Sequence, residues 1–178
     1  SAGQLLAQAA RSLELAGADF IVLCTNTMHK VAAAIENAVK IPLFHIADPT
    51  ADEIKTQGFQ RIGLLGTRFT MEQDFYKLRL QQQHGLEVVV PTSDDMDIVH
   101  RIIYQELCLG KIEDASRVEY RRIMTQLIEQ GAQAIILGCT EISLLVGAND
   151  ATVPLFDTTG LHAAKAAEFA LNFVAENA

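Results

Sequence analysis

Apolar residues in this chain occur either at helical spacing or in short continuous runs. Leu5, Leu6, Ala9 and Leu13 recur at helical spacing, which predicts a helix over 4–16 that stops at Gly17. Continuous apolar runs predict strands over 20–23, 42–45, 61–65, 87–90 and 134–137, with a further apolar segment at 154–156. Helical patterns predict helices over 28–39, 71–84, 96–109, 116–130, 142–146 and 161–174. This alternation of strands and helices predicts an α/β fold with parallel sheets.

Polar residues next to the apolar segments predict where two helices begin. Asp48 followed by Pro49 predicts an N-cap and a first helical turn. Thr70, which follows the strand predicted over 61–65, is a second candidate N-cap.

The chain also resembles itself. Residues 17–25 (GADFIVLCT) match residues 131–140 (GAQAIILGCT), and residues 41–46 (IPLFHI) match residues 153–158 (VPLFDT). Two copies of one α/β unit are expected to pack about a pseudo-twofold axis, with the carboxyl ends of their strands meeting across a ligand-binding crevice. The repeat therefore predicts two similar three-layer α/β domains, with Cys24 and Cys139 facing each other in the crevice.

The alternative interpretation of Cys24 and Cys139 is that each is a small buried residue at a strand end. The polar residues that follow each sulfur are poor choices for closing a dry core, and this favours a functional role. Cys108 has no such neighbours, and its helical context predicts that it only contributes to packing.

Two opposed thiols suit the inversion of an amino acid at Cα, because one group removes a proton from one face and the other supplies a proton to the opposite face. We expect neighbouring donors or a helix N-terminus to lower the thiol pKa. Candidate supporting acid/base residues are Glu141, for Cys139, and His29, for Cys24. The donors expected to bind the substrate and stabilise its carbanion are Thr25, Asn26, Thr27, Thr67, Thr70 and Thr140.

Charge and composition narrow the class of protein. The 178 residues carry a net charge of -8 without a basic stripe, so nucleic acid is not an expected partner. No apolar run is long enough to span a membrane. Three widely spaced cysteines indicate neither a disulfide framework nor a zinc site, and together with the lack of a signal peptide they favour the cytoplasm.

The segments Cys24-Thr25-Asn26-Thr27-Met28-His29 and Gly138-Cys139-Thr140-Glu141, together with Gly63-Leu64-Leu65-Gly66-Thr67, resemble the aspartate/glutamate racemase family. The resemblance covers essentially the whole chain. It implies an amino-acid racemase with two α/β domains and the active site between them. It also implies proton transfer between Cys24 and Cys139 without pyridoxal phosphate, metal or other cofactor, and a homodimer.

Family members usually begin with a strand and a Gly-rich loop, and no such segment precedes Ser1. The chain is therefore expected to be a truncated form. On the same resemblance, the first domain comprises residues 1–46 and 156–178, and the second comprises residues 47–155.

Other functions stay open on sequence grounds. Hydantoin racemase, maleate isomerase and arylmalonate decarboxylase are similar to the same family, although two Cys-Thr sites favour racemisation over decarboxylation. A small-molecule-binding module without turnover is a second class, supported by the missing strand. A thiol hydrolase using Cys24 and His29 ranks last, because no acidic third member is evident. Arg68 is a candidate for binding a second substrate carboxylate.

Overall fold

Two parallel sheets organise the computed structural model, which describes residues 1–177. The larger sheet has the strand order β4-β3-β5-β6, and the smaller pairs β1 with β2. The strands are β1 (Ile21–Val22), β2 (Leu43–Phe44), β3 (Arg61–Gly66), β4 (Glu87–Val89), β5 (Ala134–Gly138) and β6 (Leu155–Asp157). Every strand pairing is parallel, which confirms the predicted α/β class.

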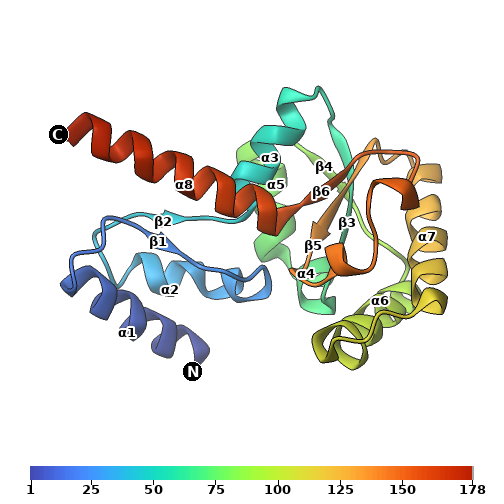
Figure 1. Cartoon of the computed structure of the whole chain (residues 1–178), viewed down its shortest axis with the longest axis horizontal. Coiled ribbons are helices and arrows are strands. Elements are labelled where there is room, and N and C mark those ends of the chain that lie inside the picture. Colours follow the sequence, from blue (N-terminus) through green and yellow to red (C-terminus); the bar gives the residue numbers. More distant parts are fainter. Residues whose placement is uncertain (178) are drawn as a thin grey trace.

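Helices surround both sheets (Figure 1). The longer ones are α1 (Ala2–Leu15), α3 (Ala47–Thr56), α5 (Asp74–His84), α6 (Ser93–Gln105), α7 (Asp114–Glu129) and α8 (Thr158–Asn177). The shorter ones are η1 (Thr27–Val31), α2 (Ala32–Glu36), α4 (Arg68–Glu72), η2 (Leu107–Leu109), η3 (Ile142–Leu144) and η4 (Ala148–Asp150). Among the described residues, no helix combines the length and apolar character that crossing a bilayer requires.

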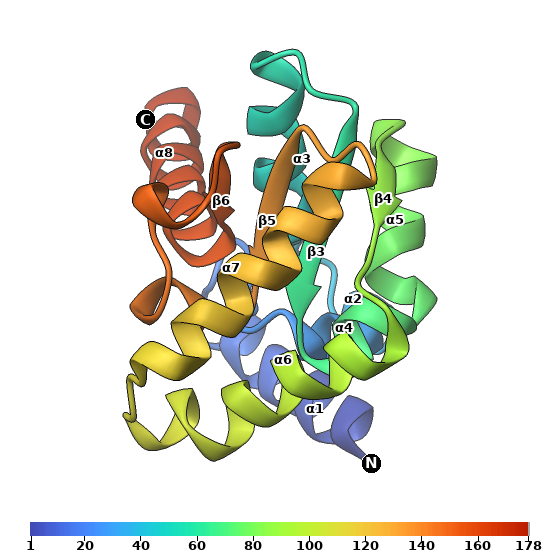
Figure 2. The same ribbon diagram turned by 90° about the vertical axis from the view of Figure 1, so that its right-hand side faces the viewer.

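The larger sheet is buried on both faces (Figure 2). Leu65, Ile135 and Leu137 pack in one apolar cluster with α6 and α7, whereas Ile62 and Ile136 pack in another with α3 and α5. Alternate residues of a strand point to opposite faces, so continuous apolar runs such as 61–65 and 134–137 fill both clusters. The part of the molecule around this sheet has three layers.

The smaller sheet is supported by a much smaller cluster. Its fully buried members are Ala10 of α1, Ile21 of β1 and Ile35 of α2. Helix α8 leaves the end of β6 and runs back along this sheet, where His162 contacts the Phe44 carbonyl oxygen at 2.7 Å from Nε2 (Figure 1).

The internal repeat is present in three dimensions. Ile21 pairs with Leu43 in the smaller sheet, and Ile135 pairs with Leu155 in the larger one, so both copies form a parallel strand pair in the same register. Each second strand leads almost directly into a helix, α3 or α8, and these two helices pack against each other. The predicted domain boundaries at 46/47 and 155/156 stay a prediction, and residue 178 lies outside the described residues.

Several expected helix boundaries are wrong. The helix expected over 28–39 is a 3₁₀ turn followed by the short helix α2, and the one expected over 71–84 is broken at Gln73, whose ψ of 150° is extended. The helix expected over 96–109 starts earlier, at Ser93, and ends at Gln105.

Both predicted N-caps are also wrong. Helix α3 starts at Ala47, so Asp48 lies in its first turn, where the carboxylate accepts two 2.6 Å hydrogen bonds from Arg79. The cap of α4 is Thr67, whose hydroxyl accepts a hydrogen bond from the backbone amide of Thr70. Asp48 is engaged by Arg79, and Thr67 takes the capping position ahead of Thr70. Neither of these contacts can be read from local composition.

Candidate active site

A cavity of about 340 Å³ lies where the carboxyl ends of β1, β3 and β5 meet. This volume is typical of a small-molecule site. The residues that line it are Thr25, Asn26, Thr27, Met28, Lys30, Thr67, Phe69, Ile103, Tyr104, Cys108, Gly138, Cys139, Thr140 and Glu141. A cavity is therefore present where the sequence predicts a crevice between the two repeats.

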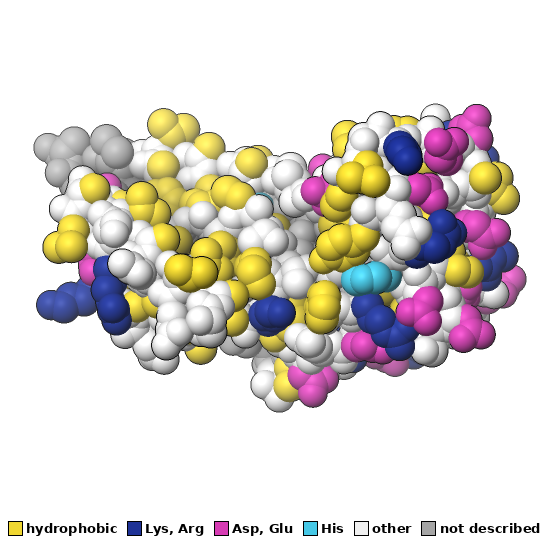
Figure 3. Space-filling model, turned by 90° about the horizontal axis from the view of Figure 1, so that it is seen from below, with side chains coloured by type: hydrophobic (Ala, Val, Ile, Leu, Met, Phe, Trp, Pro, Cys, Tyr) yellow, Lys and Arg dark blue, Asp and Glu magenta, His cyan; other side chains and the backbone are white. Residues whose placement is uncertain are grey.

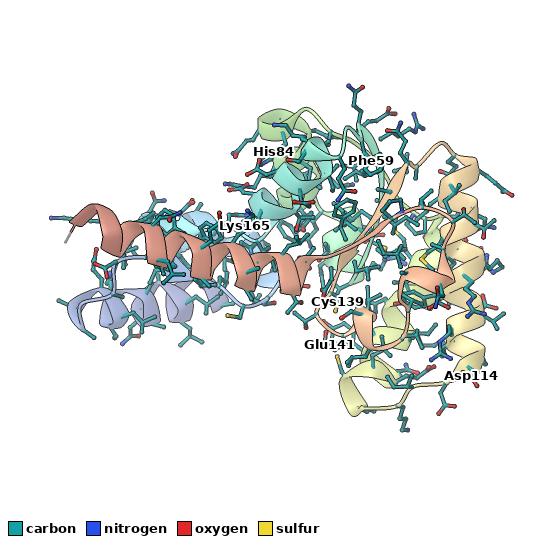
Figure 4. All side chains as sticks on the ribbon, turned by 45° about the horizontal axis from the view of Figure 1, so that its top comes forward. Phe59, His84, Asp114, Cys139, Glu141 and Lys165 are labelled. Carbon is teal, nitrogen blue, oxygen red and sulfur yellow. The ribbon has the colours of Figure 1, made fainter. Side chains whose placement is uncertain are left out.

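Cys139 and Glu141 form a hydrogen-bonded pair at the end of β5 (Figure 4). The thiol donates to Glu141 Oε2 at a distance of 2.9 Å. Burial, followed by the hydrogen bond to Glu141, raises the pKa of the Cys139 thiol to about 12. The expectation of a lowered thiol pKa is thus wrong for Cys139, because the thiol is buried and the group two residues away is an acceptor carboxylate.

Glu141 carries the negative charge of this pair. Partial burial opposes ionisation, but hydrogen bonds from Cys139, Thr140 and its own backbone hold the pKa of Glu141 below its usual value. The proton of the pair therefore resides on sulfur, and Cys139 is poised to donate.

Three threonines join the loop after β1 to the loop after β3. The Thr27 hydroxyl lies 2.8 Å from that of Thr67, and Thr70 contacts both, at 3.4 and 3.2 Å. Thr27 and Thr67 line the cavity, whereas Thr70 is fully buried behind them. The sequence-predicted residues are brought together, and Thr70 supports the other two.

Asn26 is held between the two repeats. Its side-chain amide donates to the Thr158 hydroxyl at 3.0 Å, and Thr158 donates to the Leu137 carbonyl at 2.9 Å. Asn26 is 3% exposed, and its Oδ1 has no hydrogen-bond partner among the described residues. A buried acceptor left unpaired next to a cavity is a point at which a donor group of a ligand is expected to bind.

The structure does not place Cys24 in the same cavity as Cys139. Cys24 is exposed, its thiol lies 3.9 Å from the Val22 carbonyl oxygen, and it lines a separate cavity of about 150 Å³ beside His162. Thr140 lines both cavities, and Thr25 lines that of Cys139.

The strand register explains this difference. Ile21 and Ile135 occupy equivalent positions, and counting four residues onward from each gives Thr25 and Cys139. The internal repeat matches Cys24 with Cys139 only if Gly138 is treated as a one-residue insertion. In three dimensions, Thr25 is the counterpart of Cys139.

His29 is not free to exchange a proton with Cys24. Its Nδ1 lies 2.6 Å from the Thr25 carbonyl oxygen, and its Nε2 accepts from the Ile46 amide at 3.2 Å. Nδ1 is therefore the protonated nitrogen, and burial lowers the pKa of this neutral ring to about 4. The acid/base role expected of His29 stays a prediction; in this structure both ring nitrogens are engaged, and His29 holds the backbone of Thr25.

Two further predictions need correction. Cys108 is exposed and lines the cavity, because α6 ends at Gln105 and does not carry it into the core. Arg68 is not a cavity residue, since its guanidinium pairs with Glu72 and Asp97.

The sequence interpretation does not include several side chains that line the cavity, among them Lys30, Phe69 and Tyr104. Lys30 Nζ lies 4.9 Å from the centre of the Phe69 ring. The signal for Lys30 in the sequence is its position three residues after Thr27. Within the described part of the chain, no group of three or more His, Cys, Asp or Glu side chains is arranged to hold a metal ion.

Comparison with solved structures finds relatives that share the fold. The chain is 60% identical to a candidate Asp/Glu racemase from Yersinia pestis, covering 95% of this chain and 74% of that one with a TM-score of 0.90. It is 37% identical to an aspartate racemase homologue from Pyrococcus horikoshii, with coverages of 94% and 74% and a TM-score of 0.83. A Francisella tularensis glutamate racemase, at 20% identity with coverages of 98% and 65% and a TM-score of 0.72, shares the fold.

Curated relatives are more distant. The broad specificity amino-acid racemase RacX of Bacillus subtilis is 24% identical over 83% of this chain, which spans 63% of its length. The glutamate racemase of Persephonella marina is 24% identical over 72% of this chain, which spans 48% of its length. Residues 1–166 match the Asp/Glu/Hydantoin racemase family. The chain therefore belongs to that family.

Proposed function

We propose that this protein racemises an amino acid of the aspartate/glutamate class by moving a proton at Cα, with Cys139 as one of two acid/base groups. The observation that carries the proposal is the hydrogen-bonded Cys139–Glu141 pair in a cavity also lined by Asn26, whose buried Oδ1 has no hydrogen-bond partner among the described residues. A zwitterionic amino acid requires acceptors for its ammonium group, such as the Glu141 carboxylate, and donors for its carboxylate, such as the threonine hydroxyls of the cavity. The chain spans less than two thirds of the length of these curated relatives, so the proposal is argued from the site and not from their names.

Substrate binding follows from the polar groups in the cavity. In the proposal, the α-ammonium group donates to Asn26 Oδ1 and faces Glu141, and the α-carboxylate accepts from the hydroxyls of Thr27, Thr67 and Thr140. A bound ammonium also favours the thiolate form of Cys139 through its charge, which offsets the raised pKa of the free site. The carbanion that forms at Cα is stabilised by the same donors.

In one direction, Cys139 as thiolate removes the Cα proton and a second group delivers a proton to the opposite face; in the other, Cys139 as thiol donates. We keep Cys24 as the second group indicated by the sequence, and set Thr25 beside it, because Thr25 shares the cavity with Cys139. A threonine hydroxyl loses its proton much less readily than a thiol, so the two assignments predict different kinetics.

The experiment follows Cα deuterium incorporation and chirality of L- and D-aspartate and of L- and D-glutamate in deuterated water. Cys139→Ala is expected to abolish inversion. Thr25→Val abolishes inversion and Cys24→Ala leaves it within about threefold if Thr25 is the partner; the reverse pattern assigns Cys24. Asp19→Asn, a change in the loop before β1, serves as the control.

The outcome also separates the alternatives. Incorporation of deuterium without inversion indicates a one-sided reaction of the same family, such as a decarboxylase-like or isomerase-like site. Inversion of a hydantoin but of no amino acid indicates a hydantoin racemase. Tight binding of an amino acid without any exchange indicates a binding module and contradicts the proposed activity.

A further inference from the structure

The cavity carries two charged side chains among the described residues that line it, Glu141 and Lys30. Glu141 is already engaged by the Cys139 thiol. Lys30 is the cation, and it belongs to η1, the 3₁₀ turn that starts directly after Asn26. The cavity thus has an acidic end beside Cys139 and one basic side chain.

No other described residue competes for the charge of Lys30. Among the described residues, none of the carboxylates lies within ion-pair distance of it, and its ammonium group rests against the Phe69 ring at 4.9 Å. Contact with an aromatic face holds a lysine without neutralising it. In contrast, the nearby Arg68 is neutralised by Glu72 and Asp97 and lies outside the cavity lining.

The backbone that carries Lys30 is fixed by buried contacts. The neighbouring His29 bonds to both the Thr25 carbonyl and the Ile46 amide, and Asn26 is bonded to Thr158. The long side chain of Lys30 therefore starts from a defined point and remains exposed and adjustable at its end.

We propose that Lys30 binds the side-chain carboxylate of an acidic amino acid and thereby determines which substrates are accepted. The inference rests on the proposed function and adds the specificity determinant to it. With the α-ammonium at Asn26 and Glu141 and the α-carboxylate at the threonines, the second carboxylate is left to face Lys30 and Phe69. One flexible ammonium group can reach the side-chain carboxylate of either aspartate or glutamate, since the two side chains differ in length by a single methylene.

The test compares acidic amino acids with their neutral amides, which have nearly the same shape. Wild type, Lys30→Met, Lys30→Arg and the control Lys55→Met, an exposed lysine of α3, are assayed with aspartate, glutamate, asparagine and glutamine. Lys30→Met is expected to raise KM for the two acids about tenfold, which is the usual effect of losing one charge-assisted hydrogen bond, and to leave KM for the amides unchanged. Lys30→Arg restores most of the preference, and Lys55→Met changes nothing.

An unchanged ratio of acid to amide kcat/KM in Lys30→Met overturns the inference. Binding separates this result from a failure of the proposed function. If wild type inverts none of these amino acids, the racemase assignment fails, and calorimetric binding of aspartate then judges Lys30: weaker binding in Lys30→Met supports its role, and equal binding overturns it.

Discussion

At the scale of single residues, the protonation of Cys139 reflects its burial and its hydrogen bond to Glu141. A thiol donating to a carboxylate at 2.9 Å in a buried setting stays protonated, and the pKa of Cys139 lies near 12 as a result. The Glu141 carboxylate therefore opposes formation of the Cys139 thiolate. In the proposed reaction, the positive charge of the bound substrate has to lower the pKa of Cys139 before the thiol can act as a base.

Replacing Glu141 by glutamine tests this directly. Glu141→Gln removes both the negative charge and the strong acceptor, so the pKa of Cys139 is expected to fall and the thiolate to be more abundant at any pH from 7 to 10. The rate of iodoacetamide alkylation of the Cys139 peptide, followed by mass spectrometry, should rise about tenfold or more at pH 8.

Glu129→Gln, an exposed position at the end of α7, is the matched control and should not alter alkylation. Reading the Cys139 peptide separately excludes the exposed Cys24 and Cys108. An unchanged or slower reaction in Glu141→Gln contradicts the assignment of Glu141 as a group that, together with burial, raises the pKa of the Cys139 thiol.

The sequence identified much of this residue-level picture and missed a definable part. Asn26, Thr27, Thr67, Thr140, Cys139 and Glu141 were all predicted and all line the cavity. The position of Cys24 could not be predicted from the repeat alone. The sequence match treats Gly138 as an insertion, and only the strand pairing shows that Gly138 corresponds to Cys24. The engagement of His29 was missed because its partner, the Ile46 amide, lies 17 residues away.

At the scale of elements, β3 and β5 approach each other more closely at their carboxyl ends than side chains permit. A Cβ on Gly66 would lie 2.8 Å from the Gly138 carbonyl oxygen, and a Cβ on Gly138 would lie 2.8 Å from that of Leu65. Backbone cannot move aside as a flexible side chain can. The two glycines are thus needed for the sheet to place Cys139 beside the loop that contains Thr67.

Gly138→Ala is expected to lower the free energy of unfolding by about 2–4 kcal/mol, since a buried overpacking clash must be relieved by a backbone shift. The control Gly147→Ala adds a methyl group where nothing lies within 4 Å and should change stability by less than about 0.5 kcal/mol. Urea denaturation measures both variants. Equal stabilities for the two would show that the strands separate without strain.

Element boundaries were less predictable than element types. All five segments predicted as strands form strands, and the further apolar segment at 154–156 contributes to a sixth, because continuous apolar runs suit a sheet covered on both faces. The start of α3 was not predicted because the Asp48 carboxylate binds Arg79 of α5. A capping rule considers only residues next to the helix start and does not include this contact.

At the scale of the whole molecule, three buried histidines lie where the smaller sheet meets α3 and α8. The rings of His29 and His45 are 4.1 Å apart, and His29 and His162 are 6.2 Å apart. Burial lowers the pKa of His29 to about 4 and that of His45 to about 2, and it also lowers the pKa of His162. All three are therefore neutral in the folded protein at pH 7.

This cluster makes stability depend on pH in a defined window. Below pH 6.5 the unfolded chain protonates these histidines while the folded protein does not, so stability is complete above pH 6.5 and is lost as the pH falls toward 4. Between pH 7.5 and 4.5, we expect a loss on the order of 2 kcal/mol for each of His29 and His45. Denaturant unfolding at several pH values measures it.

His45→Asn is the informative variant, since an asparagine oxygen can still accept from the Ala47 amide that His45 now binds through Nδ1. It should lose less stability than wild type over the same interval. The control His100→Gln, on α6 away from the cluster, should follow wild type. Identical pH curves for wild type and His45→Asn would exclude the cluster as the cause.

Figure 3 shows most of the visible acidic side chains gathered at one end of the molecule, over the larger sheet and its helices, with apolar side chains more prominent toward the other end. The two ends are joined covalently where β2 passes into α3 and where β6 passes into α8, each within three residues, and α3 packs on α8 between them. These two short connections leave little free chain between the two ends. The Asn26–Thr158 and Thr27–Thr67 hydrogen bonds further fix the loop of residues 25–30 to the ends of β6 and β3, so the width of the cavity beside the Cys139–Glu141 pair depends on the same few contacts that join the two sheets.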